Sequence, residues 1–145
     1  MSRCSNAREP KGVTGVPTRV KLLEELTELV NQRRPVPIAH YFTEDFRLDD
    51  AGAGLVRTGY AGAQTMIAEI LSLAPDVRLE MLDTVEGADR VAVRWRLTGT
   101  RTTGSFDVAI IAIYRFSNGR IAEDWGGWSG KPWQLARDGK PTRSD

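Results

Sequence analysis

Cysteine and histidine each occur only once in this sequence of 145 residues, as Cys4 and His40. A single cysteine permits no disulfide framework, and one histidine cannot build the multi-histidine ligand sets of zinc sites. No other metal-ligand spacing is present, so we expect no metal cofactor. The scarcity of cysteine fits a reducing compartment, and we expect a cytoplasmic protein.

Neither sign of charge dominates, because 20 Lys and Arg side chains balance 19 Asp and Glu side chains, for a formal net charge of +1. A nucleic acid or an anionic membrane surface is normally met by a basic field, so we expect neither partner. There is no apolar run long enough to cross a bilayer, and residues 1–16 lack the apolar core of a signal peptide. The charge balance therefore points to neutral or small partners.

A phosphate-binding glycine motif is also missing. The run GYAGA at Gly59 to Ala63 is not set in a strand, GxGxxG and helix unit, so we expect no nicotinamide or flavin cofactor. Any chemistry would then come from side chains alone.

One domain is expected at 17–135, preceded by a disordered leader at 1–16 and followed by a flexible tail at 136–145, because the length allows one core. Apolar residues at helical spacing predict a helix from Thr18 to about Arg33 and another from Gly59 to Leu73. Pro37 can begin a short helix between them that runs to Phe42.

Period-two alternation predicts strands in the rest of the chain. They run over 46–50, 77–81, 91–97 and 106–116, with a last strand after the Asn118-Gly119 hairpin turn. The segment 106–116 is apolar on both parities, which predicts a central strand covered on both faces. Helices in the first half and strands in the second predict an α+β domain whose curved sheet closes over the helices. Such a cone has an apolar interior that suits a small molecule.

The last strand contains an unexpected acid. Alternation divides it into two faces, one with Ala122, Asp124, Gly126 and Trp128 and the other with Ile121, Glu123, Trp125 and Gly127. In one interpretation Asp124 points into the cavity beside an aromatic wall. In the other, Trp125 packs into the core and Asp124 is solvated.

A second acidic position, Asp49-Asp50, ends the strand at 46–50 just before a glycine-rich loop. Aspartates at such a place are also common for turn reasons alone. His40 is a candidate general base or a structural side chain beside Tyr41, and Tyr60 is a candidate hydrogen-bond donor or a packing residue. Arg94 and Arg96 share one face of their strand, and Trp95 lies on the other. The face with the arginines would be solvated, would face a second copy in a dimer or would bind an anion.

Three segments carry a resemblance to a known family: GYAGAQTMIAEILSLAPDVRL at 59–79, RVAVRWRLTGT at 90–100 and AIYRFSNGRIAEDW at 112–125. With the order of elements, they resemble the SnoaL-like polyketide cyclases of the nuclear transport factor 2-like superfamily, which also contains ketosteroid isomerase. The resemblance covers roughly 20–135. It implies a cone-shaped, strongly curved mixed β-sheet against three helices, a cystatin-like α+β barrel, and a homodimer formed through the sheet.

The resemblance also implies site residues. Asp50 matches the carboxylate that shuttles a proton in ketosteroid isomerase, and Asp124 faces the cavity as its partner. The resemblance places Val91, Val93, Trp95, Tyr114 and Trp128 on cavity-facing positions. From their own chemistry or spacing, Met66, His40 and Tyr60 complete the expected substrate-binding residues. Two departures argue against the steroid isomerase mechanism itself, because its oxyanion-hole tyrosine and second acid align with Leu26 and Ala112. The acid of SnoaL-type cyclases aligns near Gly126, on the same strand face as Asp124.

The sequence thus leads to an expected function. It is a cofactor-independent acid/base enzyme of the cyclase or isomerase type, acting on a lipophilic polyketide- or terpenoid-like molecule in natural-product biosynthesis. An epoxide hydrolase, an epoxide-opening cyclase or a dehydratase of the same fold is the first alternative. A non-catalytic module that binds a small molecule or a protein is the second.

Overall fold

A computed structural model describes residues 18–50 and 54–126. The leader at 1–16, the tail at 136–145 and Trp128 lie outside these residues. The described elements, in chain order, are α1 (Arg19–Asn31), α2 (Ile38–Tyr41), β1 (Phe42–Asp50), β2 (Leu55–Thr58), α3 (Gly59–Leu71), β3 (Arg78–Glu86), β4 (Arg90–Arg101), β5 (Gly104–Ser117) and β6 (Arg120–Trp125).

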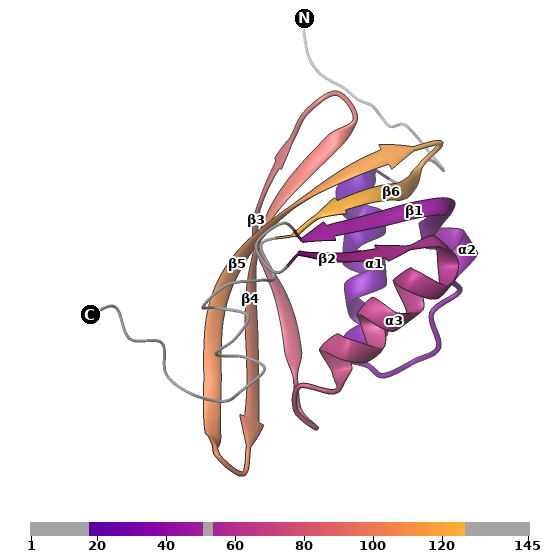
Figure 1. The fold of residues 1–145 in the computed structure, drawn as a ribbon. Coiled ribbons are helices and arrows are strands. Elements are labelled where there is room, and N and C mark those ends of the chain that lie inside the picture. Colours follow the sequence, from indigo (N-terminus) through magenta and orange to yellow (C-terminus); the bar gives the residue numbers. More distant parts are fainter. Residues whose placement is uncertain (1–17, 51–53, 127–145) are drawn as a thin grey trace, which may run out of the picture.

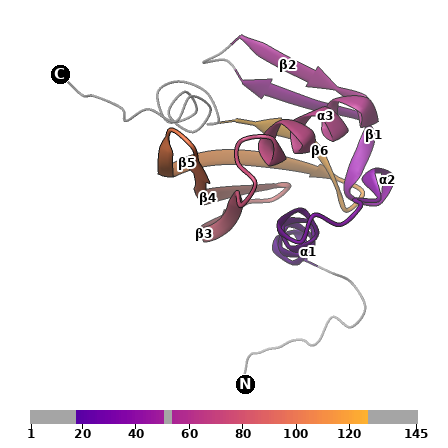
Figure 2. The same ribbon diagram turned by 90° about the horizontal axis from the view of Figure 1, so that it is seen from below.

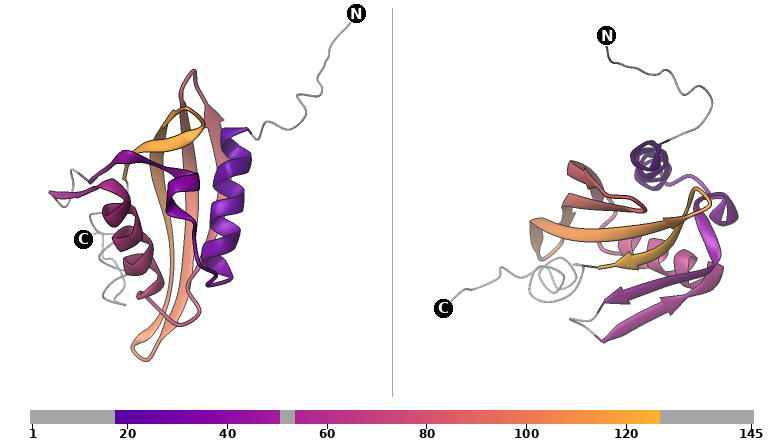
Figure 3. Two further views of the ribbon diagram at one scale, coloured as in Figure 1. Left: turned by 90° about the vertical axis from the view of Figure 1, so that its right-hand side faces the viewer. Right: turned by 90° about the horizontal axis from the view of Figure 1, so that it is seen from above.

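The strands form one mixed sheet in the order β2-β1-β6-β5-β4-β3 (Figure 1). β1 and β6 run parallel, and the other neighbours run antiparallel. The sheet is strongly curved but not closed, and α1 and α3 lie on its concave side (Figures 2 and 3). This arrangement confirms the predicted α+β cone. Among the described helices, none is long and apolar enough to span a membrane.

Helix α1 is fixed at both ends by side chains. The Thr18 hydroxyl accepts a hydrogen bond from the Lys21 amide at 3.0 Å, the usual role of threonine before a helix. At the other end, the Asn31 side chain both donates to the carbonyl and accepts from the amide of Leu79 on β3, each at 2.9 Å. Since β3 is an edge strand, α1 is bound directly to the edge of the sheet.

Strand β5 is central in the sheet, as predicted, but it is not covered on both faces. Its even-numbered residues from Phe106 to Phe116 are buried, whereas Ile111 and Ile113 on the other face are 58% and 41% exposed. The prediction was wrong because two neighbouring strands, rather than a second covering layer, give β5 its central place. The outer face of the sheet therefore displays an apolar patch.

Strand β6 follows a tight turn in which Asn118 and Gly119 both have positive φ, 52° and 76°, as the hairpin prediction required. Its pairing with β5 jumps from Phe116 opposite Ile121 to Arg115 opposite Glu123, so β6 contains a one-residue bulge. Because of the bulge, Ile121 points inward together with Asp124. The prediction that these two residues lie on opposite faces was therefore wrong. The exposed Trp125 is on the outer face.

Candidate active site

An apolar pocket lies between the two long helices and the concave face of the sheet. It holds about 490 Å³ of space not filled by atoms, counted out to its open mouth. The lining residues come from α1, α3 and five strands: Leu23, Leu26, Thr27, Val30, Phe42, Met66, Ile67, Ile70, Leu79, Trp95, Tyr114, Ile121 and Asp124. None of these described lining residues is basic. The pocket thus favours an uncharged, lipophilic ligand.

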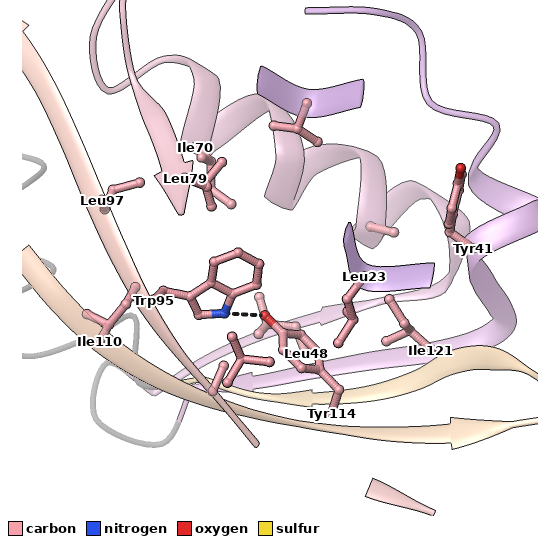
Figure 4. Close-up of a cluster of buried hydrophobic side chains, with 14 of the residues drawn as sticks. Leu23, Tyr41, Leu48, Ile70, Leu79, Trp95, Leu97, Ile110, Tyr114 and Ile121 are labelled. Carbon is pink, nitrogen blue, oxygen red and sulfur yellow. Dashed lines mark hydrogen bonds between the residues drawn. The ribbon is translucent and has the colours of Figure 1, made fainter. Parts of the chain in front are cut away.

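Burial distinguishes the mouth of the pocket from its floor. Leu26 and Thr27 on α1 and Met66 and Ile67 on α3 are half-buried, so the mouth lies between the two helices. The lining residues from the sheet are buried and form the floor (Figure 4). A ligand would pass between α1 and α3 to reach Asp124.

Asp124 is the carboxyl group at the floor. It is only 1% exposed, and its Oδ1 atom is buried without a hydrogen-bond partner. It lies opposite Tyr114 on β5 and opposite Leu48 on β1. Such a buried polar atom is unusual in a folded protein, which makes Asp124 a candidate for a chemical role.

Asp50 is a second buried carboxyl group on the neighbouring strand. It is the last residue of β1, is 1% exposed and has a buried Oδ1 atom without a partner. Asp50 lies two positions after Leu48, so the side chains of Leu48 and Asp50 share the inward face and Asp50 lies diagonal to Asp124. Asp50 is not among the described lining residues of the pocket.

Electrostatics make Asp124 a neutral acid near physiological pH. Burial first, and the negative charge of Asp50 second, raise the pKa of Asp124 from an ordinary value of 3.8 to about 8. The charged form is disfavoured because an apolar pocket replaces water around the carboxylate. Asp124 can therefore give a proton to an oxygen atom at pH 7, which an ordinary aspartate cannot do.

Two aromatic residues form the polar part of the floor beside Asp124. The Trp95 indole Nε1 donates a hydrogen bond to the Tyr114 hydroxyl at 3.0 Å, and both side chains are buried (Figure 4). Their rings are nearly perpendicular, with centroids 6.5 Å apart. This pair connects β4 to β5 across the base of the pocket.

The structure brings four predicted site residues together in the pocket: Met66, Trp95, Tyr114 and Asp124. It places the other described substrate-binding candidates elsewhere. Val91 and Val93 are fully buried in the core, because the pocket reaches only part of the concave face. His40 is exposed on α2 with its ring edge-on to Tyr41, and Tyr60 is half-buried against the core.

Sequence reasoning missed the contribution of α1 to the lining. Leu23, Leu26, Thr27 and Val30 recur at helical spacing, which predicted a face turned toward the core but not one that borders a pocket. Ile121 was missed because the bulge in β6 has no clear signal in the sequence. Among the described residues, no three His, Cys, Asp or Glu side chains are arranged to hold a metal ion.

Comparison with known proteins places this geometry in context. A family model described as the SnoaL-like domain matches residues 23–124. No curated protein matches the chain.

One similar solved structure is a protein of ketosteroid isomerase-like fold from Catenulispora acidiphila in complex with trimethylamine. It is 18% identical to this chain, with a TM-score of 0.69, and the match covers 83% of this chain and 94% of that one. IdmH, a candidate polyketide cyclase from Streptomyces antibioticus, is 22% identical with a TM-score of 0.65, covering 74% and 89%. A candidate SnoaL-like polyketide cyclase from Jannaschia sp. CCS1 is 17% identical with a TM-score of 0.65, covering 81% and 90%. At these identities the likeness shows the fold.

Proposed function

Because this chain belongs to the SnoaL-like domain family, we propose that it is a cofactor-independent acid/base enzyme of the cyclase or isomerase type. One observation carries the proposal: Asp124 is a buried carboxyl group with a pKa of about 8 at the floor of an apolar pocket, beside a second buried carboxyl group. Two carboxyl groups in different protonation states can remove a proton from carbon and give one to oxygen.

The proposed substrate is a lipophilic, uncharged, polyketide- or terpenoid-like molecule in natural-product biosynthesis. Its support is the lining, which is apolar except for Thr27, Trp95, Tyr114 and Asp124 and contains no described basic residue. A phosphate or carboxylate group would lose its water shell in this pocket without meeting a cation.

In the proposed mechanism, the ligand extends past Asp124 toward β1, where the Asp50 carboxylate takes a proton from a carbon atom next to a carbonyl group. The electron pair of the broken C–H bond forms an enol, whose oxygen receives the proton of Asp124. In isomerisation, Asp50 then gives its proton to another carbon of the enol, and the enol O–H returns its proton to Asp124. In cyclisation, the enol carbon attacks a second carbonyl carbon, whose oxygen takes the proton from Asp50, while the enol O–H returns its proton to Asp124. The proton count of the enzyme is unchanged after one turnover.

The test measures exchange of carbon-bound hydrogen and product formation together. The protein is incubated in D₂O with a linear poly-β-ketone, a β,γ-unsaturated ketone and a terpenoid epoxide, and products are followed by mass spectrometry. Asp124→Asn should lower turnover at least about 100-fold, the usual weight of a general acid. Asp50→Asn should abolish deuterium incorporation at carbon.

Matched controls are the neighbouring, partly exposed acids of the same strands. Asp49→Asn and Glu123→Gln make the same replacement of a carboxyl group by an amide but lie on the outer face, so turnover should be retained. Turnover of the epoxide alone, with oxygen from water, would favour the epoxide hydrolase alternative. Binding without turnover, unaffected by Asp124→Asn, would contradict the enzyme proposal and leave a binding module.

We further propose that two copies associate through the outer face of the sheet. Ile111, Ile113 and Trp125 expose an apolar patch there, and Trp125 is 54% exposed. The ion pairs among the described residues of this face include Arg94–Asp83 and Arg96–Asp107 at 2.7 Å and Arg115–Glu123 at 3.1 Å. A patch of this kind, surrounded by paired charges, is typical of a protein interface.

Light scattering after size-exclusion chromatography tests this association. The wild type should have twice the chain mass of 16.1 kDa, and Ile111→Lys should have the mass of one chain. Val56→Lys is the control, since Val56 is 42% exposed on β2 at the far edge of the sheet. A wild-type protein of single-chain mass would contradict the proposal.

A further inference from the structure

The pocket has few polar side chains, and nearly all of them lie at one end of it. The Trp95 indole donates a hydrogen bond to the Tyr114 hydroxyl at 3.0 Å, and Tyr114 lies opposite Asp124 on the neighbouring strand, so these three groups share the floor. The Thr27 hydroxyl on α1 is away from them and donates to the Leu23 carbonyl at 2.6 Å, within its own helix. A polar group of a ligand would therefore find its partner at the floor.

Hydrocarbon side chains form the walls between the mouth and the floor. At the mouth they are Leu26 on α1 and Met66 and Ile67 on α3, and further along the same helices they are Val30 and Ile70. The backbone N–H groups behind these side chains are used by hydrogen bonds within the helices. Along the described walls, the middle of a ligand thus meets hydrocarbon and no donor.

A ketone or epoxide oxygen accepts hydrogen bonds but cannot donate one, so in a dry pocket it needs a donor. Protonated Asp124 has an O–H group at the floor, and its Oδ1 atom is buried without a partner. Asp50 carries a negative charge toward Asp124, and a carboxylate can only accept. An oxygen held against the walls would lose its water without a replacement, which lowers affinity.

Resting on the proposed function, we propose that the substrate has one ketone or epoxide oxygen at one end of a hydrocarbon body and enters the pocket with this oxygen first. Among the proposed substrates, this selects a terpenoid-like molecule or a fully reduced polyketide-like chain. It excludes a poly-β-ketone, which has a carbonyl group on every second carbon. An aldol cyclisation needs a second carbonyl group inside the pocket, so isomerisation or epoxide opening is the reaction that this substrate class supports.

The test locates the positions at which the pocket accepts a second oxygen. The probes are decan-2-one and a set of analogues in which an ether oxygen replaces one methylene group at a time. This replacement keeps the length of the chain and adds one acceptor. Dissociation constants are measured with the full chain by isothermal titration calorimetry.

In the wild type, decan-2-one should bind more tightly than the ether analogues. An ether oxygen in the middle of the chain should weaken binding at least about tenfold, because it meets the hydrocarbon walls. The loss should be smaller for an oxygen near the far end of the chain, since the mouth of the pocket is only half-buried and water reaches it.

Two substitutions of Asp124 test whether the ketone oxygen lies at the floor. Asp124→Leu removes the proposed partner and should weaken binding of decan-2-one about tenfold, whereas Asp124→Asn keeps a donor in its amide group and should stay within about threefold. If Asp124→Leu does not fold, the comparison of Asp124→Asn with Asp124→Ala replaces it.

A donor added to the wall tests the other half of the proposal. Leu26→Asn places an amide group at the half-buried mouth and should strengthen binding of at least one ether analogue about threefold. Leu29→Asn is the matched control, because Leu29 is also half-buried on α1 but does not line the pocket. It should strengthen none of them.

Four results would each overturn the proposal. They are an ether analogue with its oxygen in mid-chain that binds the wild type as tightly as decan-2-one, an unchanged affinity for decan-2-one when Asp124 is apolar, equal effects of Leu26→Asn and Leu29→Asn, and failure of decan-2-one to bind.

These binding measurements need no turnover, which separates this inference from the proposed function. Turnover of the linear poly-β-ketone would overturn the inference and leave the acid/base enzyme. The expected pattern of affinities, together with no turnover of any of the three test compounds, would overturn the enzyme and leave a pocket that binds ligands with one oxygen.

Discussion

At the scale of single residues, Asp124 is important because its burial is costly. A carboxyl group placed in an apolar pocket without a hydrogen bond to Oδ1 lowers the stability of the fold, and the protein nevertheless keeps it there. The gain is a proton that stays on the acid at neutral pH. Asp50 contributes to this state through its charge, which disfavours a second charge on Asp124.

The Asp50→Asn substitution separates these two causes. Removing the neighbouring charge should lower the pKa of Asp124 below 8, while burial, the larger cause, should hold it above the ordinary 3.8. Infrared difference spectra across a pH series follow the carbonyl band of the protonated acid, which is assigned with Asp124→Asn. Asp49→Asn should leave the titration of Asp124 unchanged. An unchanged titration of Asp124 in Asp50→Asn would show that the charge of Asp50 does not raise the pKa of Asp124.

Alternation along β6 put Asp124 and Trp125 on opposite faces but left open which of them points inward, and the family resemblance implied Asp124. The structure buries Asp124 and exposes Trp125, and both residues follow the bulge. The same rule failed for Ile121, because a bulge shifts every residue on one side of it. His40 was proposed from its chemistry alone, and the short helix α2 exposes it. A side chain's chemistry is readable in a sequence, but its direction depends on local geometry that the sequence shows only weakly.

At the scale of elements, the bond between α1 and the edge strand holds one wall of the pocket. Asn31→Ala removes both hydrogen bonds to Leu79 and should lower the free energy of unfolding by about 1–2 kcal/mol, because water can replace part of the loss at a sheet edge. Urea unfolding measures this change. Gln32→Ala, the exposed neighbour, should change stability by less than about 0.5 kcal/mol. An equal effect of both would contradict the role of Asn31.

Close contact between β4 and β5 depends on Gly99. A Cβ atom at this position would come within 2.6 Å of the Phe106 ring and 2.9 Å of the Ala74 Cβ. Gly99→Ala should therefore destabilise the fold by about 1–3 kcal/mol in thermal or urea unfolding. Gly87→Ala is the control, since its Cβ would lie 3.8 Å from the nearest atom, the Arg90 carbonyl oxygen. A neutral Gly99→Ala would show that the strands can move apart.

Long segments with a clear periodicity were predicted well, whereas short segments and the segment that is apolar on both faces were not. The helices at 19–31 and 59–71 and the long strands stand close to their predicted places. Strand β2 was missed because four residues give too little alternation, and β1 begins at Phe42, which was assigned to the short helix. The two-sided apolar pattern of β5 was attributed to a covering layer, whereas its outer isoleucines are exposed.

At the scale of the whole molecule, the raised pKa of Asp124 couples folding to pH. Between pH 3.8 and about 8, unfolded Asp124 is ionised while folded Asp124 keeps its proton, so stability falls as pH rises through this window. Relative to Asp124→Asn, the wild type should lose up to about 1.4 kcal/mol of unfolding free energy per pH unit between pH 5 and 8. Urea unfolding at each pH measures the difference, and a constant difference would contradict the raised pKa.

The cone itself could be predicted because the order of elements and their apolar faces leave few ways to build one core. An apolar interior was part of that prediction, but the extent of the pocket within it could not be predicted. Its extent depends on how far α1 and α3 stand apart and on which inward side chains fill the space, as the burial of Val91 and Val93 outside the pocket shows. These are tertiary distances that no local pattern encodes.

The proposed function depends most on a neutral aspartic acid, Asp124, at the floor of an apolar pocket. A carboxyl-carbon NMR titration of the wild type, labelled at aspartate and assigned with Asp124→Asn, tests it most directly. The Asp124 resonance should titrate with a midpoint near 8. A midpoint near the ordinary 3.8 would contradict it.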